Sequence, residues 1–511
     1  MIEKKLIKRI LDAKAPVFLI AQITLICLYS GKLIFLAFAS NTMWGDEAYS
    51  LIQIQQSWKD LIQILITIDV HPPFYFFILK AVSLVFTNGI AVMKMVSVFP
   101  AILTAIFACL FLKKEFSAKA ALVFLLALIA CESITRYAIE IRMYSWAMFF
   151  ITMMAVSAFY FFKTAKRRWW TALLLCAVCA AYTHSFAMLT AAIGYLLLFL
   201  YTLKLRKEKI LPMLILAGCA IMLFLPWIIV LAGQFSSTVS DVFWIPPLTL
   251  KTVLRYVAFV FSAGNKFLSI IFFSIFCAVI VFFFVRKNKL QKDYFVFGGL
   301  SCAVLLFLSG IVLSIAVYPL FVARYGVPVL GLVWLFFAAQ CAAIQSKRIF
   351  IVLLLILSFI GFGSFSHSAK NEIKEHKESN LFYTHITTYL QKDDVFVGGR
   401  PYVFIMNYLF PSQEYMMEPV STLRSYTGYA VKLWKSPHFR THKLPAEYDV
   451  NIYNDRTVWT FVAGRRNDGK MQYDYYTIPP DSLGKFQGDF RWNRYYFRLY
   501  RSEPNVNENA N

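Results

Sequence analysis

Acidic and basic side chains occur in short motifs that separate long apolar segments. The first motif, residues 43–50, places the adjacent carboxylates of Asp46 and Glu47 just after the first apolar segment. Adjacent carboxylates repel each other, which tends to raise the pKa of one and makes it a candidate general base. The pair could also bind a divalent cation, or be a solvated pair of loop acids with no chemical role.

A second motif, residues 69–73, joins Asp69 and His71 to two prolines. Proline suits the first turn of a helix because its missing N–H would be unpaired there in any case. Asp69 and His71 could bind phosphate or a metal ion near the surface of a membrane. The alternative is a helix cap followed by an interfacial histidine.

The third motif contains Glu140 and Arg142, which are two residues apart. Side chains at this spacing do not share a helix face, so the two need not pair with each other. Ionisable groups at membrane depth usually face a polar cavity. Arg142 could hold a phosphate, and Glu140 could hold substrate hydroxyl groups or orient Arg142. The alternative is an interfacial pair of charges with other partners.

Two later motifs complete the candidate set. His184 ends an apolar segment, where a histidine is more often a satisfied interfacial residue than a ligand. Arg324 and Tyr325 lie in a short turn between two apolar segments. The fork of an arginine matches phosphate oxygens, although snorkelling of the side chain explains the position equally well. Tyr144 could line a substrate site, but core packing is the simpler account.

Apolar segments must position these motifs. The chain of 511 residues is 59% apolar and only 15% charged, which excludes an ordinary soluble enzyme and a disordered chain. Runs of about 20 apolar residues are long enough to cross a bilayer as helices. We therefore predict a polytopic α-helical membrane protein with eleven spans, at residues 15–39, 91–112, 120–135, 143–162, 169–184, 186–203, 210–231, 267–285, 294–316, 327–345 and 349–366.

The distribution of charge predicts the orientation of the spans. Residues 1–366 hold 32 Lys and Arg but 12 Asp and Glu, whereas residues 367–511 hold 19 and 16. The excess lies in clusters between spans, as the positive-inside rule requires, and is not a signal for nucleic acid. We expect a cytoplasmic N-terminus, a retained first helix without signal-peptide cleavage, and an outer loop over residues 41–90 that carries the acids.

Outside the spans we expect interfacial helices and one polar domain. Short apolar segments at 72–87 and 249–262 predict helices that lie in the membrane interface. Residues 367–511 predict an α/β or α+β domain outside the cytoplasm, with β-rich runs at 394–397 and 457–462. All nine cysteines fall in apolar segments, so no disulfide framework holds this domain.

The sequence contains no nucleotide-binding glycine loop and no H-E-x-x-H motif. An enzyme that acts on the outer face of a membrane needs an activated donor, and nucleotide sugars and ATP are not expected there. A lipid-linked donor meets this need.

Taken in order, the motifs resemble those of a known family. The residues that carry the resemblance are 44–50, 69–75, 140–144 and 182–184, followed by 226–227, 244–247 and 324–328. They resemble bacterial GT-C glycosyltransferases of the protein-mannosyltransferase (family 39) superfamily, whose relatives include the lipid A aminoarabinose transferases. The resemblance covers about residues 1–350 and does not extend into the C-terminal domain.

The resemblance implies an inverting single displacement on the outer face of a bacterial plasma membrane. The implied donor is a polyprenyl-phosphate-linked sugar, and the acceptor is a hydroxyl group of a lipid, glycan or protein. Asp46 is the implied base, with Glu47 beside it for positioning or metal binding. His71, Arg142 and Arg324 are expected at the donor phosphate. The remaining candidates are expected to bind or position substrate: Asp69, Glu140, Tyr144, His184 and Tyr325.

Two questions stay open at this point. Metal use varies among relatives, so a divalent cation held by Asp46, Glu47, Asp69 and His71 is an expectation that the resemblance does not decide. The alternative function is a transporter or flippase of polyprenyl lipids or glycans, which would also carry buried charges. Such a protein would more often show repeated halves and broken helices near the midplane of the membrane.

Overall fold

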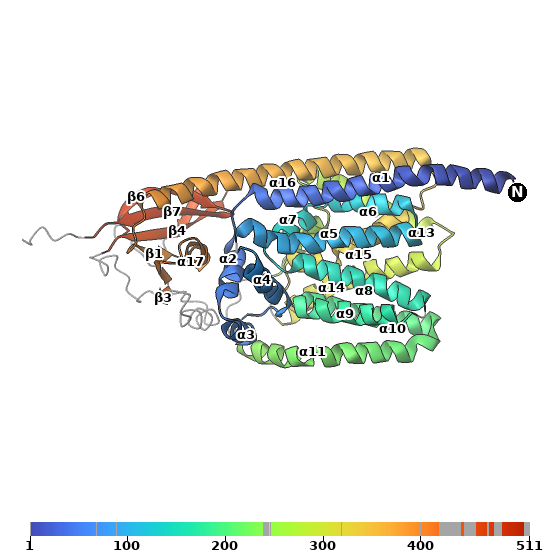
Figure 1. The fold of residues 1–511 in the computed structure, drawn as a ribbon, viewed down its shortest axis with the longest axis horizontal. Coiled ribbons are helices and arrows are strands. Elements are labelled where there is room, and N and C mark those ends of the chain that lie inside the picture. The colour runs from blue at the N-terminus through green and yellow to red at the C-terminus, as the bar shows by residue number, and fades with distance from the viewer. Residues whose placement is uncertain are drawn as a thin grey trace, which may run out of the picture.

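The computed structural model shows a bundle of long helices with a small sheet domain at one end (Figure 1). The structure describes residues 2–67, 69–87, 89–164, 166–238, 245, 247–317, 319–398, 400–417, 441–443, 456–467, 470–474 and 483–504. The chain starts at the far end of the bundle, and its first helix runs toward the sheet (Figure 1). We call the end of the bundle beside the sheet the domain end.

Among the described residues, nine helical segments are long and apolar enough to cross a membrane. The chain is therefore a multi-pass membrane protein. Two segments include a short 3₁₀ turn, η1 (Lys207–Lys209) before α11 and η2 (Ala323–Gly326) before α15. The long helices are α1 (Ile2–Ala39), α5 (Ile90–Glu115), α8 (Tyr144–Lys163), α10 (Ser185–Leu205), α11 (Ile210–Thr238), α13 (Lys266–Val285), α14 (Gln291–Ala316), α15 (Val327–Cys341) and α16 (Lys347–Tyr389).

The two remaining expected spans differ from a simple long helix. The segment 120–135 forms α6 (Ala118–Ala130) and α7 (Glu132–Ile139), which meet at a bend of 68° and count as a tenth span if taken together. The segment 169–184 forms α9 (Arg167–Thr183), which has 17 residues and packs against α8, α10 and α11.

The bend at Cys131 is stabilised by the loop that follows helix α12 (Leu250–Val260). Backbone N–H groups freed by the break must find new acceptors, because the bilayer offers none. The N–H of Glu132 donates to the carbonyl of Ser262 at 2.8 Å, and that of Ser133 donates to the Ser262 hydroxyl at 2.9 Å. The Glu132 carboxylate in turn accepts from Gly264, which has a φ of +86°. The bend directs α7 toward the site.

Three short helices between α1 and α5 form the domain end of the bundle: α2 (Gly45–Gln55), α3 (Trp58–Thr67) and α4 (Phe74–Val85). The helices expected at 72–87 and 249–262 are confirmed as α4 and α12. With 12 residues, α4 is too short to span a bilayer. Its buried Lys80 donates to the carbonyls of Ile54 and Gln56, which closes the C-terminal end of α2.

The C-terminal domain contains a mixed seven-stranded sheet, as the α/β or α+β expectation requires. The order is β3-β2-β1-β4-β7-β6, and β5 also pairs with β4. The first four are parallel, while β7 runs antiparallel to both β4 and β6. Helix α17 (Arg400–Leu409) connects β1 to β2. The strands are β1 (Val395–Gly398), β2 (Glu414–Met417), β3 (Thr441–Lys443), β4 (Val458–Asn467), β5 (Lys470–Asp474), β6 (Lys485–Trp492) and β7 (Tyr495–Ser502).

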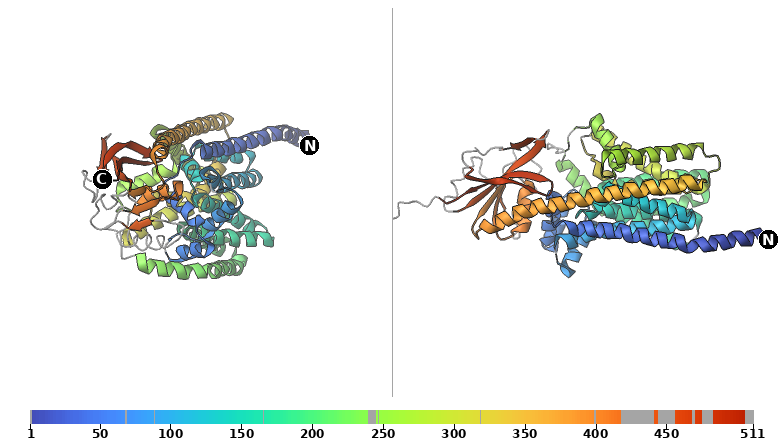
Figure 2. Two further views of the ribbon diagram at one scale, coloured as in Figure 1. Left: turned by 60° about the vertical axis from the view of Figure 1, so that its left-hand side comes forward. Right: turned by 90° about the horizontal axis from the view of Figure 1, so that it is seen from above.

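Helix α16 joins the helical bundle to the sheet domain without a break. Its 43 residues run along the bundle and continue beside the sheet (Figure 2). The boundary expected between residues 366 and 367 lies inside this helix. Phe382, near its C-terminal end, is fully buried against Phe490 and Phe497 of the sheet. The sheet is therefore fixed to the bundle by a continuous helix.

Candidate active site

Helix α2 presents Asp46 and Glu47 in its first turn, but the two side chains differ in their surroundings. Glu47 is 2% exposed. One of its carboxylate oxygens accepts from the N–H of Trp44 at 2.9 Å, and the other from the N–H of Ile141 at 2.7 Å. Burial raises the pKa of Glu47. Glu47 thus caps α2 and fastens it to the segment that follows α7.

Asp46 remains accessible on the same turn. Its side chain is 39% exposed, and its carboxylate lies 3.6 Å from Nη2 of Arg324 in η2. The carboxylates of Asp69 and Glu140 are buried, like that of Glu47. Asp46 is consequently the carboxylate of the predicted set that a substrate can reach.

Arg142 connects α2 to the segment before α4. It is 2% exposed, and its Nη1 donates to the Ser50 hydroxyl at 3.0 Å and to the Asp46 carbonyl at 3.3 Å. Its Nη2 lies 3.3 Å from Nε2 of His71. As expected from their spacing, Arg142 and Glu140 direct their side chains to different partners.

Asp69 holds both the ring and the backbone of His71. The Asp69 carboxylate lies 2.7 Å from Nδ1 of His71 and accepts from its backbone N–H at 2.8 Å. The other Asp69 oxygen accepts from Gln53 at 2.8 Å. Burial alone would raise the pKa of Asp69, but His71 and these hydrogen bonds hold it below its usual value. A continuous chain of polar contacts thus runs from Asp69 through His71 to Arg142.

Aromatic rings complete the wall of the site. The ring of His184 lies 5.8 Å from His71, 5.5 Å from Tyr144 and 5.0 Å from Tyr325, measured between centroids. Nδ1 of His184 accepts from the N–H of Phe186 at 3.0 Å and so caps α10. Burial lowers the pKa of His184 well below its usual value, with His71, Arg142 and Arg324 adding to the effect. Its other nitrogen therefore carries the proton, as a neutral donor.

The C-terminal domain adds residues that sequence reasoning missed. Arg494, in the turn between β6 and β7, donates to Glu140 at 2.9 Å, and its guanidinium carbon lies 4.0 Å from the centre of the Trp44 ring. The neighbouring Tyr495 accepts from the N–H of Gly45 at 3.0 Å. No local pattern links residues this far apart in sequence, so these contacts could not be predicted from the motifs.

The structure thus brings all ten predicted site residues into one connected cluster at the domain end. Trp244, the first residue of the motif at 244–247, lies outside the described residues.

The cluster does not fit the divalent-cation site that the sequence left open. Within the described parts of the chain, no group of three or more His, Cys, Asp or Glu side chains is placed to hold a metal ion. Both oxygens of Glu47 and of Asp69 are already engaged with N–H donors, and Asp46 faces Arg324 instead. The arrangement favours an anion beside two arginines over a cation between the carboxylates.

Comparison with known proteins identifies the fold. No family model matches the sequence, and no curated protein sequence matches it. The fold is similar to ArnT from Cupriavidus metallidurans in the apo state and bound to undecaprenyl phosphate, at 12% and 13% identity. Each similarity covers 93% of this chain and 97% of ArnT with a TM-score of 0.62. The chain therefore has the fold of ArnT, which agrees with the GT-C type of architecture expected from the motifs.

A weaker similarity is to the oligosaccharyltransferase of Archaeoglobus fulgidus in complex with Zn and sulfate. It has 10% identity and a TM-score of 0.46, and covers 90% of this chain and 74% of that protein.

Proposed function

We propose that the protein is a membrane glycosyltransferase that moves a sugar from a polyprenyl-phosphate donor to an acceptor hydroxyl by inverting single displacement. The observation that carries this proposal is the accessible carboxylate of Asp46 beside the guanidinium of Arg324. A base and an anion site lie next to each other, as this displacement requires. The GT-C fold and the ArnT complex with undecaprenyl phosphate support the donor class.

In the proposed reaction, Asp46 removes the proton of the acceptor hydroxyl. The oxygen of that hydroxyl attacks the anomeric carbon of the donor at the same time. The bond between that carbon and the phosphate oxygen breaks, and the lipid phosphate leaves with the electron pair. General-base help of this kind is typically worth about 10²–10⁴-fold.

Arg142 and Arg324 supply positive charge to the leaving phosphate. Buried or half-buried arginines are already oriented before the substrate arrives, so little reorganisation is needed as charge develops. His71 is proposed to hold Arg142 in place and to complete the phosphate site. Tyr144, His184 and Tyr325 are proposed to line the sugar site, where the neutral His184 can donate to an oxygen.

The proposed location is a bacterial plasma membrane, with the N-terminus in the cytoplasm. The site and the sheet are then extracytoplasmic, and the turns that carry the basic clusters lie at the opposite end of the bundle. Residues 1–366 form the catalytic membrane module in this proposal, and residues 367–511 form the external domain. The acceptor is a lipid, a glycan or a protein.

The first experiment incubates the purified protein with a panel of undecaprenyl-phosphate sugars and a membrane extract, and measures released undecaprenyl phosphate. Asp46→Asn is compared with Asp60→Asn, a control in α3 whose carboxylate bonds only to the nearby Ser57 in the described structure. Turnover of one donor that is lost in Asp46→Asn but kept in Asp60→Asn supports the proposal. Equal turnover by all three proteins contradicts the role of Asp46.

The transporter alternative makes a different prediction for the same samples. A flippase moves the donor between leaflets of a vesicle without releasing undecaprenyl phosphate. Its binding site is expected near the membrane midplane, whereas the cluster described above lies at one end of the helices.

A further inference from the structure

The hairpin of β6 and β7 reaches from the sheet to the start of α2. Its turn contains Asn493, which has a φ of +51°, and Arg494. We call residues 491–495 the hairpin tip. The indole N–H of Trp492 donates to the carbonyl of Met43 at 2.9 Å, and the amide of Asn493 donates to the Thr42 hydroxyl at 3.0 Å.

Two further contacts bring the hairpin tip to the residues next to Asp46. Tyr495 accepts from the N–H of Gly45 at 3.0 Å. Arg494 covers the ring of Trp44, and the guanidinium carbon of Arg324 lies 5.4 Å from the centre of the same ring. The segment that leads into α2 is therefore held by the hairpin tip from Thr42 to Gly45.

Arg494 also holds the segment of residues 140–142. Its Nη2 lies 2.9 Å from Oε1 of Glu140, while Arg136 is 3.6 Å from the same oxygen. The carbonyl of Glu140 accepts from the N–H of Arg142 at 2.7 Å. One side chain thus contacts both Trp44, directly before α2, and the segment that carries Arg142.

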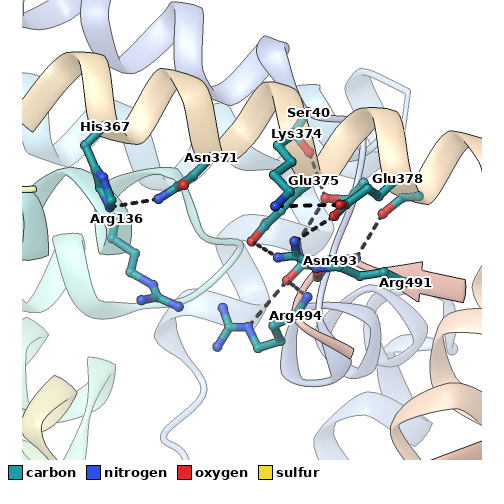
Figure 3. Close-up of polar contacts among 12 residues, drawn as sticks. Ser40, Arg136, His367, Asn371, Lys374, Glu375, Glu378, Arg491, Asn493 and Arg494 are labelled. Carbon is teal, nitrogen blue, oxygen red and sulfur yellow. Dashed lines mark hydrogen bonds and ion pairs between the residues drawn. The ribbon is translucent and has the colours of Figure 1, made fainter. Parts of the chain in front are cut away.

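The hairpin tip is itself fixed to α16 (Figure 3). Arg491 pairs with Glu375 at 2.8 Å and with Glu378 at 2.7 Å, and the N–H of Asn493 donates to the Ser379 hydroxyl at 2.9 Å. Arg491 points toward Glu375 and Glu378 of α16 (Figure 3), whereas Arg494 pairs with Glu140. The hairpin tip is a rigid support because α16 continues into the bundle.

We propose that Arg494 is a positioning residue for catalysis, which fixes Asp46 relative to Arg142 through its contacts with Trp44 and Glu140. The inference rests on the proposed function, because it assigns a role within that reaction. Displacing a reacting group by about 1 Å can cost about 10²-fold in rate. The C-terminal domain is then a working part of the active site and not an accessory module.

The test compares Arg494→Gln, Arg494→Lys and the control Arg498→Gln in the full-length protein. Arg498 lies on β7, the strand that follows Arg494, but its side chain pairs with Asp489 and contacts Phe486, away from the site. We expect Arg494→Gln to lower kcat about 10–100-fold with little change in the KM for the donor. Arg494→Lys keeps the charge near Glu140 but loses the flat contact with Trp44, so it should restore only part of kcat.

A second measurement does not depend on turnover. Hydrogen–deuterium exchange of residues 42–50 should rise in Arg494→Gln and stay unchanged in Arg498→Gln. If the wild type turns over no donor, this exchange still shows whether Arg494 orders the start of α2, so failure of the proposed function is distinguishable from failure of this inference.

An unchanged kcat in Arg494→Gln, or an equal loss in Arg498→Gln, would overturn the proposal. Unchanged exchange over residues 42–50 would also overturn it. Should Arg494→Gln fail to fold, Tyr495→Phe removes only the acceptor for the Gly45 N–H. That variant is expected to fold, to raise exchange over residues 42–50 and to lower kcat several-fold, and wild-type values for both would count against the inference.

Discussion

The guanidinium of Arg324 lies 3.6 Å from the carboxylate of Asp46, across the gap between η2 and the first turn of α2. Nothing local in the sequence joins these two residues, because Asp46 lies in α2 and Arg324 lies in η2. In the proposed reaction, this contact places the base for the acceptor hydroxyl beside a group that binds the donor phosphate.

Neutralising the two adjacent acids should have different effects. Asp46→Asn changes an accessible carboxylate and is expected to reduce turnover by about 10²–10⁴-fold with little effect on stability. Glu47→Gln replaces an acceptor of two backbone N–H groups by an amide with one acceptor oxygen. We expect it to reduce stability by about 1–3 kcal/mol. Thermal unfolding in detergent and donor turnover separate the two effects, and equal losses of stability would contradict the assignment.

Replacing Arg324 by lysine tests the shape of the phosphate site. Arg324→Lys keeps the positive charge opposite Asp46 but cannot present two parallel N–H donors to phosphate oxygens. We expect turnover to fall about 10–10³-fold, as for loss of a hydrogen-bond donor that stabilises developing charge. Steady-state kinetics with the donor that the panel experiment selects measures this. A lysine variant with wild-type kcat and KM would show that Arg324 does not bind the leaving group.

The buried His184 should make the free energy of unfolding decrease in acid. Its pKa in the folded protein is well below its usual value of about 6.5. Below pH 6.5 the unfolded chain takes up a proton that the folded chain refuses, so stability falls as the pH falls, by at most about 1.4 kcal/mol per pH unit. His184→Asn keeps an acceptor for the Phe186 N–H and removes the titration. Thermal unfolding from pH 7.5 to 5 should therefore depend less on pH in the variant, and an identical dependence would contradict this account.

Close packing between α8 and α15 depends on Gly331. A Cβ atom at this position would lie 2.0 Å from the Thr152 hydroxyl oxygen, so Gly331→Ala should cost about 1–3 kcal/mol. A Cβ added at Gly298 in α14 would meet nothing within 4 Å, so Gly298→Ala is the matched control. Thermal unfolding of both variants measures the difference. A Gly331→Ala protein as stable as the control would show that the two helices separate at little cost.

Much of the helical architecture followed from the sequence because crossing a bilayer imposes a strict length and composition on a helix. The spans, the short helices α4 and α12, and strands β1 and β4 were all predicted. The ten candidate residues that meet in the cluster were also selected from the sequence, because ionisable groups are rare in such a chain and each candidate occurred in a compact motif. The bend at Cys131 was missed, because it depends on a hydrogen bond to Ser262, a residue remote in sequence.

The sequence by itself determined which residues are candidates for chemistry. Only the tertiary structure decided which of them are buried and which are accessible to a substrate. Asp46 and Glu47 are adjacent and chemically alike, but packing against Ile141 buries Glu47 and leaves Asp46 accessible. Arg494 lies in the β6–β7 turn, and only the continuous helix α16 brings it to Trp44. Burial and long-range contact arise when the whole chain packs, so no local motif can specify them.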